Sequence, residues 1–270
     1  ALFEHPQLGS LAEQVEGRVR AGGELKTTPL REVESGEQVA LSFAQQRLWF
    51  LDQLEPGSAA YNIPVVVRLS GPLQVGALAG AFSEVVSRHE ALRTTFASEG
   101  GRPRQVIQEA RGVELPVQDL SRLGGGEREK QARQLVMREV QRRFDLEQGP
   151  LLRVGLVRLG AEEHILHITM HHIIADGWSM QVLMREMGQL YGALSSGQES
   201  ALRELPIQYA DFATWQREWL RGEVLEEQLS YWQRQLAGAP ALLELPTDWP
   251  RPRVQGYEGA VHRFTLSGEL

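Results

Sequence analysis

Two apolar runs joined by four residues constrain the fold of this chain most, because together they predict a β-hairpin. The runs cover residues 151–159 and 164–172 and are separated by Gly-Ala-Glu-Glu, a polar, glycine-containing connection of hairpin length. Apolar residues at helical spacing follow over 178–194. A chain that combines a hairpin with long helices is expected to fold as α/β or α+β, with a mixed sheet packed against helices.

The same periodicities predict the remaining elements. Helices are expected over residues 42–54, 75–92, 127–144, 207–220 and 224–236, and strands over 61–69, 106–107, 113–120 and 261–266. Ser42 is the expected N-cap of the first of these helices. His89 lies on the apolar stripe of the second helix and is expected in the core. Residues 1–19 become amphipathic and helical from Leu8 onward, and this short stripe needs a partner to cover it.

Composition excludes several classes of function. Lys plus Arg number 28 and Asp plus Glu 35, so the net charge is −7. A chain with this net charge has no overall positive potential that would attract nucleic acid or anionic lipid. The absence of cysteine removes disulfides, thiolate nucleophiles, and cysteine-ligated zinc or iron–sulfur centres. No apolar run approaches the ~20 residues that span a bilayer, and no secretory signal is visible. A cytoplasmic location is therefore expected.

The densest group of chemically capable side chains lies at 170–179, where a strand is expected to end and a helix to begin. It contains His171, His172, Asp176 and Gly177. In a strand, successive side chains point to opposite faces, so only one of the two histidines can face a given site. Gly177 lets the backbone turn sharply into the helix, and this turn is expected to leave free N–H groups near a reacting carbonyl.

Other catalytic designs are disfavoured by spacing or by missing motifs. A zinc site built from His167, His171 and His172 would need two ligands on one ion, yet His167 and His171 lie about 13 Å apart along a strand. Gly-x-Ser-x-Gly, Walker and Gly-x-Gly-x-x-Gly motifs are absent. No metal site is therefore expected.

The pattern His171-His172-x-x-x-Asp176-Gly177 resembles the signature of the condensation domains of nonribosomal peptide synthetases. Those domains belong to the acyltransferase family typified by chloramphenicol acetyltransferase. Three further segments are similar to core motifs of the family and occur in its order: 42–51, 88–96 and 209–216. The resemblance implies a chloramphenicol-acetyltransferase-like α/β lobe with a mixed, mostly antiparallel sheet.

The resemblance also implies a division of the chain. Residues 2–15 resemble the closing helix of a peptidyl carrier protein, so 1–19 are expected to come from an upstream carrier domain. Residues 20–37 are polar, broken by glycine and proline, and are expected to be a linker. Residues 38–270 are then the N-terminal lobe of a condensation domain whose second lobe is absent, and this fragment is expected to be inactive alone.

The reaction implied by the resemblance is peptide-bond formation. An acyl or peptidyl thioester on an upstream carrier is transferred to the amine of an aminoacyl thioester on a downstream carrier. By motif position, His172 is the candidate catalytic residue, acting as a base or by positioning, and His171 is expected to pack structurally. Asp176 is expected to be a scaffold residue paired with an arginine, with Arg88 slightly favoured over Arg93.

The resemblance further implies that the chain binds no cofactor of its own. The two peptidyl carriers supply 4′-phosphopantetheine arms, and a second lobe and an adenylation domain of the same synthetase are the other expected partners. Two alternatives remain: an acyltransferase that uses diffusible acyl-CoA, which the carrier-like segment 2–15 argues against, and a non-catalytic docking module, which the intact histidine pattern argues against. An L-configured donor is expected.

Overall fold

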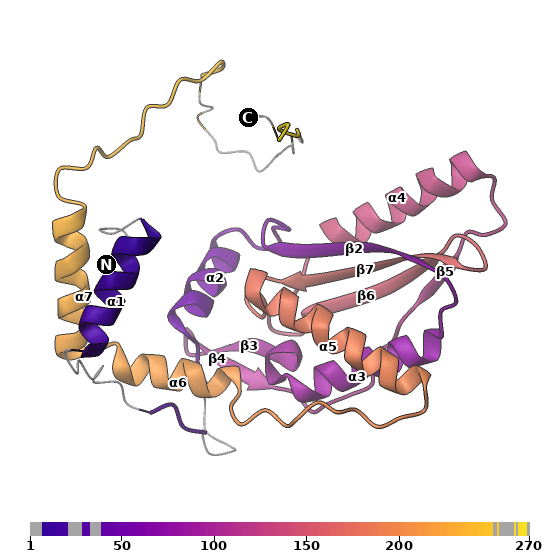
Figure 1. The fold of residues 1–270 in the computed structure, drawn as a ribbon, viewed down its shortest axis with the longest axis horizontal. Helices are drawn as coiled ribbons and strands as arrows, with labels where there is room; N and C mark the ends of the chain where they lie inside the picture. Colours follow the sequence, from indigo (N-terminus) through magenta and orange to yellow (C-terminus); the bar gives the residue numbers. More distant parts are fainter. Residues whose placement is uncertain are drawn as a thin grey trace.

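The computed structural model describes most of the chain as one mixed α/β lobe (Figure 1). The described residues are 7–20, 29–32, 39–250, 253, 262 and 264–268. The helices are α1 (Leu8–Arg20), α2 (Phe43–Leu54), α3 (Val75–Arg88), α4 (Gly125–Gln141), α5 (Gly177–Ser195), α6 (Tyr209–Trp219) and α7 (Gly222–Gln235). The strands are β1 (Val39–Ala40), β2 (Asn62–Ser70), β3 (Thr94–Glu99), β4 (Arg102–Ile107), β5 (Val117–Asp119), β6 (Leu152–Arg158) and β7 (Glu163–His171).

The central sheet has the strand order β2-β7-β6-β5. Strand β7 pairs antiparallel with both β2 and β6, and β5 joins β6 in parallel. The predicted hairpin is confirmed, with Leu152 opposite Met170 and Arg158 opposite His164. A smaller antiparallel sheet has the order β1-β4-β3. The sheet is thus mixed and mostly antiparallel, as the resemblance implies.

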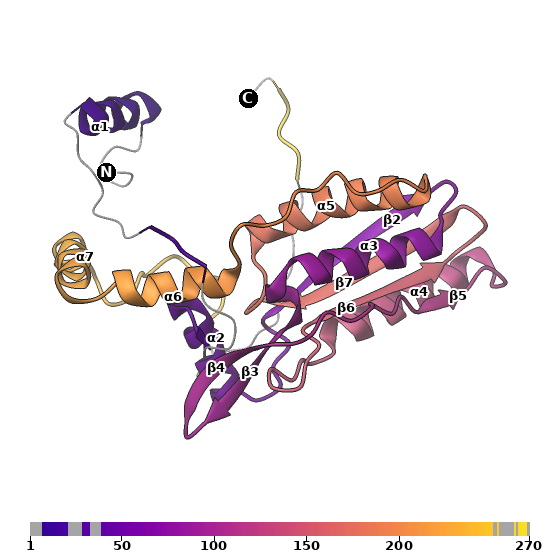
Figure 2. The ribbon, with the colours of Figure 1, turned by 90° about the horizontal axis from the view of Figure 1, so that it is seen from below.

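Helices cover both faces of the central sheet (Figure 2). Helices α3 and α5 pack together on one face over the main core, in which Phe82, Val85, Ile168, Met170 and Leu190 are buried. Helix α4 crosses the opposite face and forms a smaller apolar cluster with the sheet. Strand β7 therefore lies inside the molecule along most of its length, which holds its C-terminal end rigidly.

Most predicted elements are confirmed, with differences in extent: the helix expected over 127–144 ends at Gln141, and the strand expected over 113–120 covers only Val117–Asp119. The helix expected over 75–92 ends at Arg88, because His89 has extended backbone angles and a short 3₁₀ turn, Glu90–Arg93, follows. Val261 and Arg263 of the strand expected over 261–266 lie outside the described residues, and the described residues His262 and 264–266 are in no strand. The predicted N-cap at Ser42 is confirmed by a capping box.

The amphipathic helix expected near the N-terminus is present as α1, and its apolar side chains are largely exposed. Leu8 is 83% and Val15 54% exposed, as expected for a stripe without a partner. Residues 2–6 of the carrier-like segment and most of the expected linker, 21–28 and 33–37, lie outside the described residues. Among the described helices, none has the length and apolarity needed to cross a membrane.

Candidate active site

His172 is presented at the end of a buried strand. Strand β7 ends at His171, and the backbone N–H of His172 still donates a hydrogen bond of 2.8 Å to the carbonyl of Tyr61. The side chain itself is exposed. The backbone of His172 is therefore fixed by the sheet while its imidazole is free to meet a substrate.

The neighbouring His171 lies in the opposite environment. It is 3% exposed, its ring lies 6.3 Å from the ring of Tyr61 and 6.1 Å from that of Phe144, and its Nδ1 accepts a hydrogen bond from the N–H of Ile173. Burial, together with the neighbouring His172, lowers the pKa of His171 to about 4. A neutral, enclosed imidazole is consistent with the packing role expected for His171.

Asp176 is the N-cap of α5. Its carboxylate accepts from the N–H and the hydroxyl of Ser179, both at 2.8 Å, and the Ser179 hydroxyl accepts in return from the N–H of Asp176 at 2.6 Å. These hydrogen bonds, led by the one from the Ser179 N–H, lower the pKa of the Asp176 carboxyl. Asp176 thus sets the point at which the histidine loop becomes helix.

The ion pair expected between Asp176 and an arginine is not formed within the described part of the chain. Arg88 instead lies 3.4 Å from Glu186, and Arg93 lies 3.3 Å from Glu90. The physical reason is that the α5 cap and solvent already satisfy the exposed Asp176. Arg88 ends α3, which packs alongside α5, so it meets the acid on the inner face of α5.

That acid, Glu186, is the feature that sequence reasoning missed. It is 6% exposed, and it accepts from His89 at 2.8 Å as well as from Arg88. The expectation that His89 lies in the core is therefore wrong. His89 is half-buried, and its ring forms a hydrogen bond with Glu186. The available clue was that Glu186 stands among Leu183, Met187 and Leu190 on the buried stripe of α5, where a carboxylate needs a partner.

The turn into α5 has fewer free backbone N–H groups than expected. The N–H of Ser179 is bonded to the Asp176 carboxylate and the N–H of Met180 to the Asp176 carbonyl. These N–H groups at the helix N-terminus are thus already hydrogen-bonded within the cap and the first turn. Fewer free N–H groups remain to bind a reacting carbonyl than the loop sequence predicts. Trp178, 78% exposed, lies in the same turn.

Fold and site together define a class of protein. A mixed, mostly antiparallel sheet with helices on both faces, and an exposed histidine at the end of an interior strand, fit a lobe with the chloramphenicol-acetyltransferase-like fold. Comparison with known proteins narrows this class. The chain belongs to the condensation-domain family, because the family model described as Condensation domain matches residues 35–270.

Relatives by sequence are nonribosomal peptide synthetases and their component chains. One component of the linear gramicidin synthase of Brevibacillus parabrevis is 47% identical over 268 residues, which is 99% of this chain and 4% of that protein. Phosphinothricin tripeptide synthetase PhsC of Streptomyces viridochromogenes is 44% identical over 258 residues, which is 94% of this chain and 24% of that protein. The chain spans only a small part of these relatives.

Solved structures share the same fold. The X-domain from teicoplanin biosynthesis is 33% identical with a TM-score of 0.72, over 83% of this chain and 49% of that one. The starter condensation domain of rhizomide synthetase RzmA is 23% identical with a TM-score of 0.68, over 76% of this chain and 49% of that one. The second match bears on the fold alone, and each match covers about half of the solved chain.

Proposed function

We propose that this chain supplies the histidine-bearing lobe for peptide-bond formation in a nonribosomal peptide synthetase. The amine of an aminoacyl thioester on a downstream carrier attacks the acyl or peptidyl thioester on an upstream carrier. The observation that carries the proposal is the exposed imidazole of His172 on a backbone anchored to Tyr61.

Aminolysis of a thioester does not need a strong base, but it needs the two reactants to be held in the right positions. In the step, a C–N bond forms, the C–S bond breaks, the thiol of the upstream arm leaves, and the attacking nitrogen loses a proton. A free α-amine has a pKa of about 7.7–8.0, so a useful fraction is already uncharged near neutral pH. The imidazole of His172 is placed to accept the released proton or to orient the amine.

Two features support a role that needs partners. The relatives are large synthetase chains of which this chain covers a small part, and the solved chains it resembles are about twice as long as the matched region. We propose that a second lobe faces this one across a tunnel in which the reactants meet. Upstream and downstream carriers bring 4′-phosphopantetheine arms into it, and an adenylation domain loads the acceptor. The chain itself then needs no cofactor.

The test is a carrier-to-carrier transfer assay read by intact-protein mass spectrometry. The complete condensation domain that contains this lobe is compared with its His172→Ala variant. We expect the variant to lose about 100-fold or more in rate, the usual contribution of a positioned acid–base group. The matched control is His262→Ala, which removes another exposed histidine and should leave the rate unchanged. Equal rates for the complete domain and His172→Ala would contradict the proposal.

A second candidate function is a docking module without transfer activity. It is favoured by one observation: a solved complex of the teicoplanin X-domain with OxyB contains a chain that is 31% identical to this one, with a TM-score of 0.74. A docking role predicts no amide product in the same assay, with or without His172. An acyl-CoA-dependent enzyme would instead accept acyl-CoA in place of the loaded upstream carrier.

A further inference from the structure

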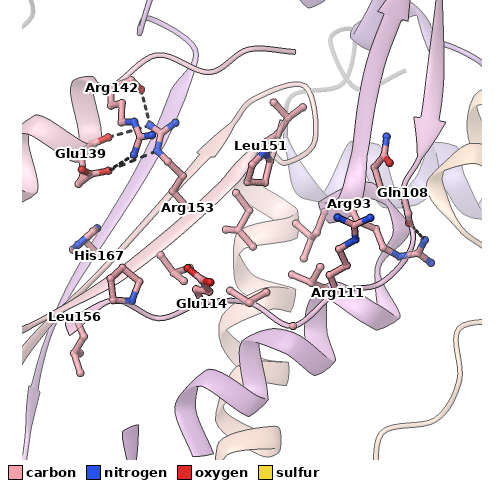
Figure 3. A pocket seen from close by; sticks show the side chains of 18 of the residues that line it. Arg93, Gln108, Arg111, Glu114, Glu139, Arg142, Leu151, Arg153, Leu156 and His167 are labelled. Atoms are coloured by element: carbon pink, nitrogen blue, oxygen red, sulfur yellow. Dashed lines mark hydrogen bonds and ion pairs between the residues drawn. The ribbon is translucent and has the colours of Figure 1, made fainter. Parts of the chain in front are cut away.

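Arg153 of β6 binds the carbonyl groups at the C-terminal end of α4. Its Nη1 donates to the carbonyl of Arg143 at 3.1 Å, and its Nη2 donates to the carbonyls of Glu139 and Arg142. Figure 3 shows the Arg153 side chain beside Glu139 and Arg142, at the wall of a cavity. The last carbonyls of a helix lack partners within the helix, and a cation there also interacts favourably with the helix dipole. Arg153 therefore holds the end of α4 against the sheet.

The guanidinium of Arg153 is a charged group in a fixed orientation. Its side chain is 14% exposed, and its Nε lies 3.8 Å from the carboxylate of Glu139. Burial, together with the neighbouring Arg142, lowers the pKa of Arg153 to about 10, which still leaves it protonated at neutral pH. Because carbonyl groups on one helix end bind two of its nitrogens, the planar group has little freedom to turn.

The same guanidinium lies over an aromatic ring that contacts the histidine motif. The Cζ of Arg153 is 3.7 Å from the ring centroid of Phe144, within the range of a cation–π interaction. Phe144 is 7% exposed, and its ring meets the ring of His171 edge-on, with 6.1 Å between the centroids. Phe144 therefore links Arg153 to the first histidine of the motif.

His171 in turn holds the backbone that carries His172. The N–H of Ile173 donates to the Nδ1 of His171 at 3.1 Å, and the N–H of His172 donates to the carbonyl of Tyr61 at 2.8 Å. Two successive N–H groups of the loop are thus bound, one of them by the His171 ring. A shift of that ring would release the Ile173 N–H and allow His172 to move.

Asn62 attaches the end of α4 from the other side of β7. Its Nδ2 donates to the carbonyls of Val140 and Arg142, at 2.6 Å and 2.9 Å. Asn62 is opposite His171 in the pairing of β2 with β7, so the strands on both sides of β7 bind this helix end. Because Asn62 is a second attachment, loss of Arg153 should release Phe144 without unfolding α4.

We propose that Arg153 is a positioning residue for His172, acting through Phe144 and His171. It keeps the Phe144 ring against His171, so the loop holds the imidazole of His172 at one place while the amine attacks the thioester. The proposal rests on the transfer role proposed for His172 and adds a residue that acts through its contacts rather than on the reactants.

The kinetic test compares the complete condensation domain that contains this lobe with its Arg153→Met variant, which lacks the charge and every donor. We expect kcat for carrier-to-carrier transfer to fall at least about tenfold with KM for the loaded carriers unchanged, because misplacing a reacting group slows the chemical step. Arg153→Lys keeps the charge but not the planar fork, and should recover part of the rate. The matched control is Arg128→Met, since half-buried Arg128 binds the carbonyl of Leu159 beyond the other end of β6. Its kcat should be unchanged.

Amide hydrogen exchange of Ile173, followed by NMR on this chain, reports the loop without any turnover. We expect exchange at least about tenfold faster in Arg153→Met and normal exchange in Arg128→Met, because only the first loses the support of the His171 ring. Either normal Ile173 exchange or an unchanged kcat in Arg153→Met would overturn the proposal.

Two further comparisons separate the possible failures. Full activity of His172→Ala would refute the transfer role, and the Ile173 exchange would still decide whether Arg153 holds the loop. Circular dichroism melting shows whether each variant folds. Should Arg153→Met fail to fold, Phe144→Leu, which removes the connecting ring, should give both changes. Normal exchange and a normal rate in Phe144→Leu would then overturn the proposal.

Discussion

At the scale of single residues, two adjacent histidines have opposite environments. His171 is enclosed by Tyr61 and Phe144 and is 3% exposed, whereas His172 is exposed. The difference arises because β7 ends at His171 and successive side chains along a strand point to opposite sides. Of the two, only His172 therefore presents its side chain to the solvent.

Burial of His171 makes the stability of the fold depend on pH. In the unfolded chain the pKa of an imidazole is about 6.5, and burial lowers the pKa of folded His171 to about 4. As the pH falls, the unfolded state binds its proton first, so stability is fully present above the unfolded value and is lost as the pH falls toward the folded one. We expect this group to reduce the free energy of unfolding by about 2 kcal/mol between pH 7 and pH 5.

Urea unfolding at both pH values measures this effect. The His171→Asn variant should lack that part of the pH dependence, because it removes the titrating group while offering an acceptor for the N–H of Ile173. His172→Asn, a change at an exposed position, should keep the dependence of the unchanged chain. Identical pH dependence in all three proteins would show that His171 is not held neutral by the fold.

At the scale of elements, the start of α5 determines the shape of the histidine loop. Asp176 and Ser179 form a reciprocal capping box, and further along the same helix Glu186 ties α5 to the end of α3 through Arg88 and His89. These contacts hold α5 at both its first turn and its middle. The loop between β7 and α5 is therefore fixed from both sides, by a strand and by a capped helix.

Loss of the α5 cap should destabilise the fold by a modest amount. Replacing Asp176 by Ala removes the acceptor for the Ser179 N–H and should cost about 1 kcal/mol, the usual cost of a lost N-cap. Asp176→Asn keeps an acceptor and should cost less. His172→Ala should change stability by no more than about 0.5 kcal/mol, because the side chain is exposed. Chemical denaturation of the three variants checks the order; a larger loss for His172→Ala than for Asp176→Ala would contradict it.

At the scale of the whole molecule, the described lobe presents its histidine on an open surface. The His172 side chain and the adjacent Trp178 are exposed, and neither lies in one of the cavities found beside the sheet. Aminolysis of a thioester requires that both reactants be held in line and that water be kept from the thioester. A side chain on an open surface meets neither requirement.

The 270-residue chain should therefore fold without forming amide bonds. We expect its carrier-to-carrier rate to be at least about 100-fold below that of the complete domain, since orientation accounts for much of such a rate. The comparison uses the same loaded carriers and the same mass-spectrometric readout for both chains. Turnover by the shorter chain that disappears with His172→Ala would show that one lobe is sufficient.

Much of the fold was predictable because it rests on local patterns. The β6–β7 hairpin follows from two apolar runs and a short polar connection, and α2 follows from the Ser42 cap and its periodicity. The end of α3 was not predictable in this way. His89 continues the apolar spacing, which predicts that the helix runs on through it. In the structure α3 ends at Arg88, and His89 forms a hydrogen bond with Glu186, a residue far along the chain.

The sequence by itself determined the order of the elements, the position of the histidine motif at a strand–helix junction and, through its motifs, the family. These depend on spacing along the chain, which sequence displays directly. Tertiary structure alone decided which groups are paired: Arg88 with Glu186 rather than Asp176, Asp176 with Ser179, and His171 with two aromatic rings. Partners of charged and buried groups are chosen by proximity in space, because the interaction of two charges weakens with their separation and with the water between them.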